Sequence, residues 1–228
     1  MGKKLFITGT GTDVGKTYVT GLIMKKLQEH GKSAGYYKAA MSGNERDGRG
    51  ALLPGDALFV KNLSGISQPL PEMCPYVYEA AVSPHLAAKL EGNPVRMEVV
   101  KKGFLEVCGK YDYVTMEGSG GILCPLSMEG GGLWLEDVAR ELGLSSLVVA
   151  EAGLGTINSL TLTVEYMRAK NLPVKGIVFN RFHPGDVMEE DNLRMCQERT
   201  GLPVVACVAK GGGELSIDIQ ALTALYED

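Results

Sequence analysis

The sequence predicts an α/β fold in a single domain of residues 1–228, with a mostly parallel central sheet and helices on both of its faces. Short apolar runs alternate with amphipathic segments along the chain, which is the order expected when helices join parallel strands. A glycine-rich loop follows the first apolar run. With 228 residues, 45% of them hydrophobic and 22% charged, the chain can bury a substantial core without disulfides or metal.

Six segments are predicted to be strands because they are apolar on both faces of the pleat and rich in β-branched residues, as strands inside a parallel sheet are. They are Lys4–Thr8, Ala34–Lys38, Tyr113–Glu117, Leu147–Glu151, Gly176–Asn180 and Val204–Val208.

Two helices are predicted from apolar residues at helical spacing. The first begins at the Gly-Lys-Thr of residues 15–17 and runs to about His30, where Gly31 favours a stop. The second ends before Pro173, and its buried side is expected to consist of Ile157, Leu160, Val164 and Met167.

The alternation weakens between Met41 and Pro84, where we expect irregular backbone. Residues 43–50 are polar and rich in glycine, and three prolines between positions 69 and 75 favour extended or turned conformations. Long irregular connections inside a compact domain usually carry function, although disorder is the alternative.

Charge and cysteine usage exclude several classes of function. The formal net charge of −4 gives no general attraction to nucleic acid or to anionic membranes. The five cysteines are scattered and form no CxxC pair, which favours reduced thiols over a zinc site or a disulfide framework. No signal-peptide pattern is present, and no apolar run approaches the roughly 20 residues that span a bilayer. We therefore expect a cytoplasmic protein without nucleic-acid or membrane partners.

Residues 9–17, Gly-Thr-Gly-Thr-Asp-Val-Gly-Lys-Thr, follow the first predicted strand and open the first predicted helix. This arrangement binds triphosphates, because backbone N–H groups converge on the anion and the helix N-terminus adds positive charge. Lys16 can reach the β and γ phosphates, and the Thr17 hydroxyl can bind Mg²⁺. A chance Gly-Lys-Thr is the alternative, since Thr10 stands where GxxxxGK[ST] has its first glycine. The expected nucleotide contacts are Gly11, Thr12, Asp13, Val14, Gly15, Lys16 and Thr17.

Two carboxylates could complete a Mg²⁺ site with Thr17. Glu117 ends a buried strand, and ligands of open α/β sheets gather at the carboxyl ends of the strands. Asp56 follows Pro54-Gly55 and precedes an apolar run. Mg²⁺ commonly takes one or two carboxylates together with phosphates and water. The alternatives are a solvated glutamate in a turn and a helix N-cap role for Asp56.

Lys38 ends the second predicted strand and would point toward the same crevice as Lys16. Taken together, the motifs resemble those of the dethiobiotin synthetase family. Residues 9–17 are similar to its loop GTDTxVGKT, with Gly11 in place of the aspartate, and residues 38–43 are similar to its lysine motif, although Ala39 stands where proline is usual. The resemblance continues, in the right order, through residues 56–58, 83–88, 117–121 and 155–158.

The resemblance implies an ATP-dependent ligase that acts on 7,8-diaminopelargonate and CO₂, with Mg²⁺ as cofactor. One amine takes up CO₂ as an N-carbamate, whose oxygen attacks the γ-phosphate to give a carbamic-phosphoric anhydride. The second amine then closes the ring of dethiobiotin. Catalysis would fall to Lys16, Lys38 and Thr12, and the metal would be held by Thr17, Asp56 and Glu117.

The resemblance also implies a homodimer whose active site is shared across the interface. Within one subunit, the substrate contacts would be Lys38, Ser42, Ser83, Gly118, Gly120 and Gly121. The neighbouring subunit would hold the substrate carboxylate through Gly155, Thr156 and Asn158, although Thr156 could instead cap its helix. The nucleobase would lie near Asn180, Val208 and Lys210. Here Arg181 follows Asn180 where the family has aspartate, and the proline expected after the sixth strand is missing.

A switch ATPase of the chromosome-partition type, with nucleotide-dependent dimerisation, is the main alternative. Such proteins resemble this chain in fold but carry a second lysine early in the loop. No lysine lies between Gly9 and Lys16, which counts against this alternative.

Overall fold

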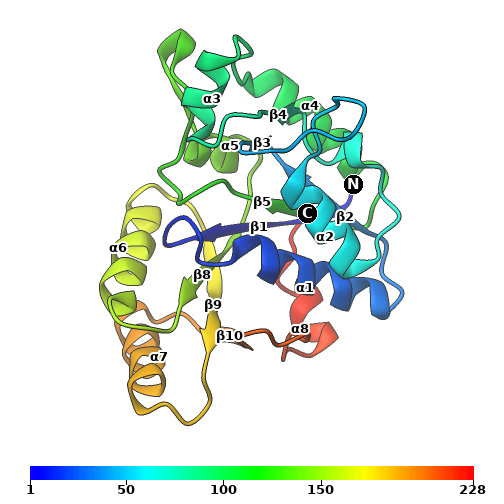
Figure 1. Ribbon diagram of the computed structural model, residues 1–228. Helices are drawn as coiled ribbons and strands as arrows, with labels where there is room; N and C mark the ends of the chain where they lie inside the picture. The colour runs from blue at the N-terminus through cyan, green and yellow to red at the C-terminus, as the bar shows by residue number, and fades with distance from the viewer.

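A central sheet of six parallel strands lies between two layers of helices in the computed structural model, which describes residues 1–228 (Figure 1). The strand order is β10-β9-β8-β1-β5-β2. All six predicted strands are confirmed and differ from the prediction only at their ends: β1 Lys3–Gly9, β2 Ala34–Lys38, β5 Tyr113–Glu117, β8 Ser146–Glu151, β9 Val174–Phe182 and β10 Val204–Ala209.

Helices cover both faces of this sheet because each strand alternates its buried side chains between the faces. Leu5 and Ile7 of β1 join one core cluster, while Phe6 between them joins the other. The first face is covered by α1 (Lys16–Glu29), α2 (Gly55–Ser64) and α8 (Ile219–Thr223). The second is covered by α4 (Met97–Cys108), α5 (Leu135–Glu141), α6 (Thr156–Ala169) and α7 (Val187–Thr200), and α3 (Pro84–Leu90) joins the same core cluster but packs mainly on residues 125–127. The two predicted helices are confirmed as α1 and α6.

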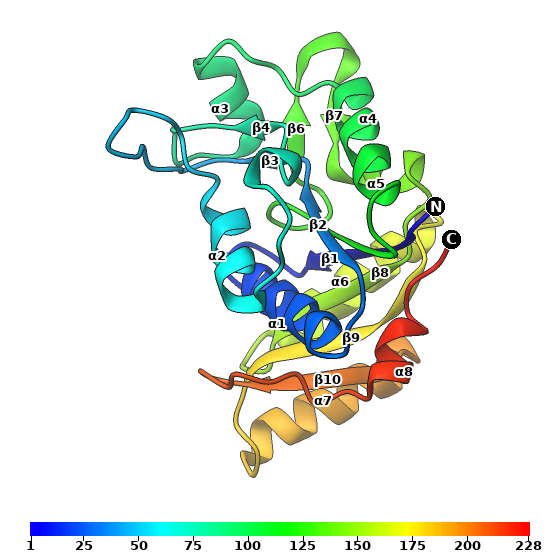
Figure 2. The ribbon, with the colours of Figure 1, turned by 90° about the vertical axis from the view of Figure 1, so that its right-hand side faces the viewer.

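Residues 41–84 are less irregular than the sequence predicts. Helix α2 lies within them, and β3 (Ala40–Met41) pairs with β4 (Tyr76–Val77) in a short parallel sheet. The apolar run 57–60 has no clear helical period, so the sequence pattern does not predict α2. The connection from β3 to α2 is a loop, and it stands out from the body at the left of Figure 2. The remaining short strands, β6 (Pro125–Ser127) and β7 (Leu133–Trp134), form an antiparallel pair.

Strand β2 lies at an edge of the sheet, and its outer backbone groups have partners. The Gln68 side chain accepts a hydrogen bond from the Tyr36 N–H (2.7 Å) and donates one to the Tyr36 carbonyl (3.0 Å). The Lys38 N–H donates to the carbonyl of Met73 at 2.8 Å. An edge strand held in this way places its side chains as firmly as an inner strand does.

The pairing of β1, β5 and β2 brings the predicted site residues to one end of the sheet. Glu117 is the register partner of Ile7 on one side and of Lys38 on the other. The glycine-rich loop leaves β1 two residues after Ile7 and leads into α1. None of the helices combines the length and the apolar character needed to cross a membrane, and all five cysteines are unpaired.

Candidate active site

The loop between β1 and α1 needs glycine at position 15. Gly15 has φ +90°, and a Cβ added there would lie 1.9 Å from Nδ2 of Asn180. Asn180 belongs to β9, is 3% exposed, and donates from Nδ2 to the carbonyl of Val14 at 3.0 Å. Asn180 therefore holds the loop in place from strand β9. The sequence predicted Asn180 to lie near the nucleobase and did not predict this contact with the loop.

Lys16 is folded into the concave side of this loop. Its Nζ donates to the carbonyl of Gly11 at 2.7 Å, and only 6% of the residue is exposed. Burial lowers the pKa of Lys16 to about 8, and the nearby charge of Lys38 adds to the shift. An arriving phosphate can replace the Gly11 carbonyl as the partner of this ammonium, since charged acceptors make the stronger hydrogen bond.

Glu117 is the centre of a buried cluster formed by four elements. Its Oε1 accepts hydrogen bonds from Thr17 Oγ1 (2.7 Å) and from Lys38 Nζ (2.6 Å). Lys38 also donates to Asp56 Oδ2 at 2.7 Å, and Thr17 Oγ1 lies 3.4 Å from Asp56 Oδ1. The Glu117 side chain is fully buried, whereas that of Asp56 is 40% exposed. The three predicted metal ligands and Lys38 thus lie together, although they come from α1, β2, α2 and β5.

Lys38 carries its positive charge in this cluster. Burial alone would lower its pKa, but the charges of Glu117 and Asp56 outweigh that effect and hold the pKa above its ordinary value. For Asp56, burial would raise the pKa, and the Lys38 ammonium reverses the shift and lowers it. Lys38 is therefore suited to stabilising an anion and unsuited to accepting a proton.

The two helix-capping alternatives are wrong. Asp56 lies in the first turn of α2 behind an N-cap position held by Pro54, and the Gly55 N–H donates instead to Asn44 Oδ1 at 2.9 Å. This leaves the Asp56 carboxylate free to face Lys38. At α6 the N-cap is Gly155, with φ +88° and no side-chain cap, and the Oγ1 of Thr156 is buried without a partner.

A cleft of about 1040 Å³ opens above this cluster. It is lined by eleven of the predicted residues: Thr12, Asp13, Gly15, Lys16, Thr17, Lys38, Ser42, Asp56, Ser83, Glu117 and Gly120. The sequence did not single out Tyr18, Phe59, Val82 and Cys124, which also line it, and it marked Arg181 only as a departure from the family pattern. They are ordinary hydrophobic, aromatic or surface residue types, so only their position around the cleft distinguishes them.

The other predicted residues lie outside the cleft lining. The Gly118 N–H donates to the Ile7 carbonyl at 2.9 Å, so this amide continues the sheet pairing, and Gly121 lies behind the loop against Gly9. Val208 is fully buried and Lys210 is exposed at the end of β10. The remaining ones are Gly11, Val14, Asn180 and the α6 group Gly155, Thr156 and Asn158.

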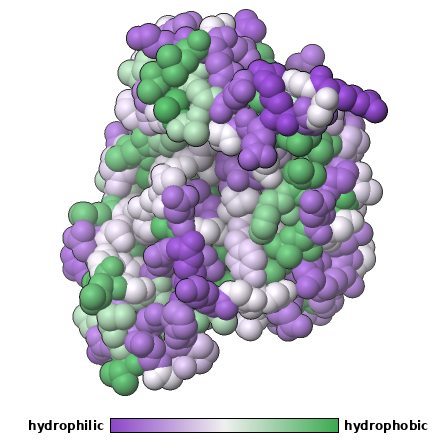
Figure 3. Space-filling view, viewed as in Figure 1, coloured by the Kyte–Doolittle hydropathy of each residue, from purple (hydrophilic) through white to green (hydrophobic).

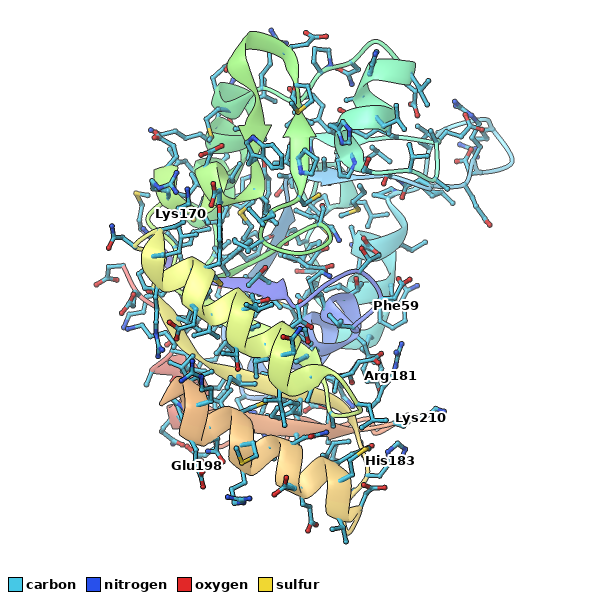
Figure 4. The ribbon with its side chains drawn as sticks, turned by 90° about the vertical axis from the view of Figure 1, so that its left-hand side faces the viewer. Phe59, Lys170, Arg181, His183, Glu198 and Lys210 are labelled. Carbon is cyan, nitrogen blue, oxygen red and sulfur yellow. The ribbon has the colours of Figure 1, made fainter.

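A second cavity of about 650 Å³ lies at the ends of β9 and β10, lined in part by Phe182, Pro184, Cys207 and Ala209. Figure 4 shows Arg181, Lys210 and His183 along the same edge of the molecule as Phe59, which lines the cleft. The predicted nucleobase residue Lys210 therefore lies along the same edge of the molecule as a residue of the cleft.

Fold and site together define a P-loop nucleotide-binding protein: a parallel sheet, a glycine loop between β1 and α1 that encloses a lysine, and a threonine beside an acidic strand end. The family described as "AAA domain" matches residues 3–211. An ATP-dependent dethiobiotin synthetase BioD of Brachyspira hyodysenteriae is 45% identical over 228 residues, which is 100% of both chains. A protein of the same name from Clostridium botulinum (strain 657 / Type Ba4) is 46% identical over 229 residues, again 100% of both. The chain belongs to the dethiobiotin synthetase family.

The fold is also similar to that of a solved MinC:MinD cell division protein complex from Aquifex aeolicus. The TM-score is 0.56 with 14% sequence identity, over 91% of this chain and 81% of that chain. This likeness concerns the fold alone. It leaves the partition-type switch as a distant structural relative and gives it no support as the function.

Proposed function

We propose that this protein is an ATP-dependent dethiobiotin synthetase, which carboxylates 7,8-diaminopelargonate with CO₂ and closes a cyclic urea while ATP becomes ADP and phosphate. One observation carries the proposal. Lys38, a second buried ammonium, comes from strand β2 and faces the same cleft as Lys16, which begins α1. A switch ATPase needs only the phosphate loop, whereas transfer to a second substrate needs a cation where that substrate's anion forms.

The oxygen donors of the cluster fit Mg²⁺. The hydroxyl of Thr17 and the carboxylates of Asp56 and Glu117 surround the Lys38 ammonium, which stands in for a cation among them. Hard oxygen ligands with one or two carboxylates are what Mg²⁺ prefers. When bound there, Mg²⁺ would neutralise charge on the β and γ phosphates of ATP.

The residues of this chain have distinct tasks in the proposed reaction. An alkyl amine has a pKa of about 10, like free lysine, so carbamate formation depends on surroundings that favour the neutral amine and the new anion. The Lys38 ammonium and the Gly120 amide would stabilise the carbamate. Lys16 would stabilise charge on the transferred phosphate. Thr12 and Ser42 line the cleft, where they would orient the diamine by hydrogen bonds.

Holding both amines beside the phosphate removes much of the entropic barrier of the two steps. The carbamate oxygen attacks the γ-phosphate, whose bond to the β-phosphate oxygen breaks, giving the carbamic-phosphoric anhydride and ADP. The second amine then attacks the carbonyl carbon and expels phosphate, which closes the ring.

We also propose a homodimer that completes the site. Gly155, Thr156 and Asn158 open α6 but do not line their own cleft, so they would bind the substrate carboxylate of a second copy. Apolar side chains are exposed at the starts of α6 and α7: Leu154 is 89% and Val187 is 82% exposed. Figure 3 shows apolar groups at the lower left, over α6 and α7. Exposed apolar surface of this kind marks interaction sites.

For the nucleobase, we propose the cavity at the ends of β9 and β10. Val208 would contribute its backbone, since its side chain is buried, and Lys210 would lie at the rim. We assign all of these activities to one domain of residues 1–228, working in the cytoplasm, where the five thiols stay reduced.

The test is to incubate the protein with 7,8-diaminopelargonate, bicarbonate and MgATP and to look for dethiobiotin by mass spectrometry. A reaction without the diamine is the control. ADP release that is unaffected by the diamine, with no dethiobiotin formed, would contradict the proposal and favour the switch ATPase.

A further inference from the structure

The phenol of Tyr36 contacts the metal-binding cluster from a position that the proposed reaction does not use. Tyr36 lies in β2 and is fully buried, and its hydroxyl donates to Glu117 Oε2 at 2.9 Å. The other oxygen, Oε1, accepts from Thr17 and Lys38. The two oxygens of Glu117 therefore have separate partners: one faces the cleft cluster and the other faces the core.

The backbone of β2 fixes this contact. Tyr36 and Lys38 are two residues apart, so their side chains leave the same face of the strand and reach Glu117 from neighbouring positions. Gln68 holds both the N–H and the carbonyl of Tyr36, which keeps the strand from shifting. The phenol is consequently directed at the carboxylate by strand geometry and by its edge clamp.

We propose that Tyr36 is a positioning residue for Glu117: by holding Oε2, it keeps Oε1 turned toward the metal and Thr17. This inference rests on the proposed metal role of Glu117. Without the phenol, Oε2 would be buried with no partner, and the carboxylate would turn to share Lys38 or Thr17 between its oxygens. Partners of this kind behind a metal ligand typically change metal affinity by about 10–100-fold when removed.

The neighbouring tyrosine provides a matched control. Tyr37 is also fully buried in β2, and its hydroxyl donates to the Val100 carbonyl at 2.9 Å. It belongs to the core on the opposite face of the sheet, away from Glu117. Tyr36→Phe and Tyr37→Phe each remove one buried phenol and one hydrogen bond, but only the first touches the carboxylate.

The test measures Mn²⁺ binding in the presence of ADP by electron paramagnetic resonance, with the full chain. We expect Tyr36→Phe to weaken Mn²⁺ affinity about tenfold or more, with ADP affinity in the absence of metal unchanged. Tyr37→Phe should bind Mn²⁺ like the unaltered protein. In turnover assays, Tyr36→Phe should raise the Mg²⁺ concentration needed for half-maximal rate, whereas a purely structural role would not change it.

The Glu117→Gln variant separates this inference from the proposal beneath it. If Glu117→Gln loses Mn²⁺ affinity while Tyr36→Phe keeps it, Tyr36 does not position the ligand, although the metal role of Glu117 stands. If Glu117→Gln itself binds Mn²⁺ normally, the metal assignment fails first.

A double variant, Tyr36→Phe with Glu117→Gln, removes the phenol together with the charge that it faces. It should bind Mn²⁺ no differently from Glu117→Gln alone, because there is no carboxylate left to position. A further loss in the double variant would overturn the inference. This comparison also keeps the inference open to refutation if Tyr36→Phe alone does not fold, since the double variant buries no unpaired carboxylate.

Discussion

Replacing Lys38 by methionine removes the ammonium that joins Glu117 to Asp56 while keeping a side chain of similar length. Breaking a buried ion pair by deleting one partner costs about 3–5 kcal/mol, because the other charge stays buried without compensation. Glu117 is such a charge, with its side chain fully buried. The pair with Asp56 adds less, about 0–1 kcal/mol, because that carboxylate is 40% exposed. Thr17 and Tyr36 still donate to Glu117, so we expect a loss near the low end, about 3 kcal/mol.

Urea unfolding at pH 7, with and without Mg²⁺, measures this loss. We expect Mg²⁺ to stabilise Lys38→Met more than the unaltered protein, because the ion enters carboxylates that no longer have an ammonium between them. Lys61→Met is the control: it removes one charge from α2, but its Nζ donates to the carbonyl of Gln68 (2.6 Å) and to no carboxylate. The reasoning would be refuted if Lys38→Met lost less than about 1 kcal/mol of unfolding free energy, or if Mg²⁺ stabilised Lys38→Met and the unaltered protein equally. Ring closure should be lost in Lys38→Met while nucleotide affinity persists.

Three further outcomes are expected. Gly15→Ala should weaken ATP binding about tenfold or more, because it adds about 1–3 kcal/mol of backbone strain and a clash with Asn180. Gly48→Ala is the control and should bind ATP normally, because open space surrounds Gly48. Calorimetric titration with ATP measures both affinities. Because the pKa of Lys16 is about 8 in the free protein against an ordinary 10.5, the unfolded chain binds more protons between these values, so this group makes stability rise as pH increases through that window. ATP favours the charged ammonium of Lys16, so ATP binding at pH 8.5 should be accompanied by uptake of a proton. Calorimetric titrations in two buffers of different ionisation enthalpy detect this uptake. Binding without proton uptake near that pH would contradict the lowered pKa of Lys16. Leu154→Asp should give monomers by light scattering and abolish dethiobiotin formation while sparing ADP binding, and an active monomer would exclude a shared site.

The sequence predicted best those features that follow from strand position. Glu117 and Lys38 each end a strand, and parallel strands bring such residues to one edge of the sheet, so their meeting could be foreseen. The strands themselves were recognisable because both of their faces are buried. The family motifs supplied Asp56, which no strand positions.

The features that were missed depend on contacts that no local pattern encodes. Tyr36 and Tyr37 are adjacent aromatic residues of one strand. Only their neighbours in space, Glu117 of β5 for one and Val100 of α4 for the other, make the first a partner of a carboxylate and the second a partner of a carbonyl. The role of Asn180 beneath Gly15 depends on how closely β9 approaches the loop. Asn44 takes the helix-start role considered for Asp56, from a loop that the sequence described only as polar and glycine-rich.

The clamp on strand β2 has a consequence for how two copies can associate. Gln68 and Met73 occupy the outward N–H and carbonyl groups of Tyr36 and the outward N–H of Lys38. A strand from another molecule would therefore find these backbone groups already paired, which disfavours a sheet running continuously through two copies at β2. Contact between two copies at this part of β2 would have to use side chains in place of a shared strand ladder.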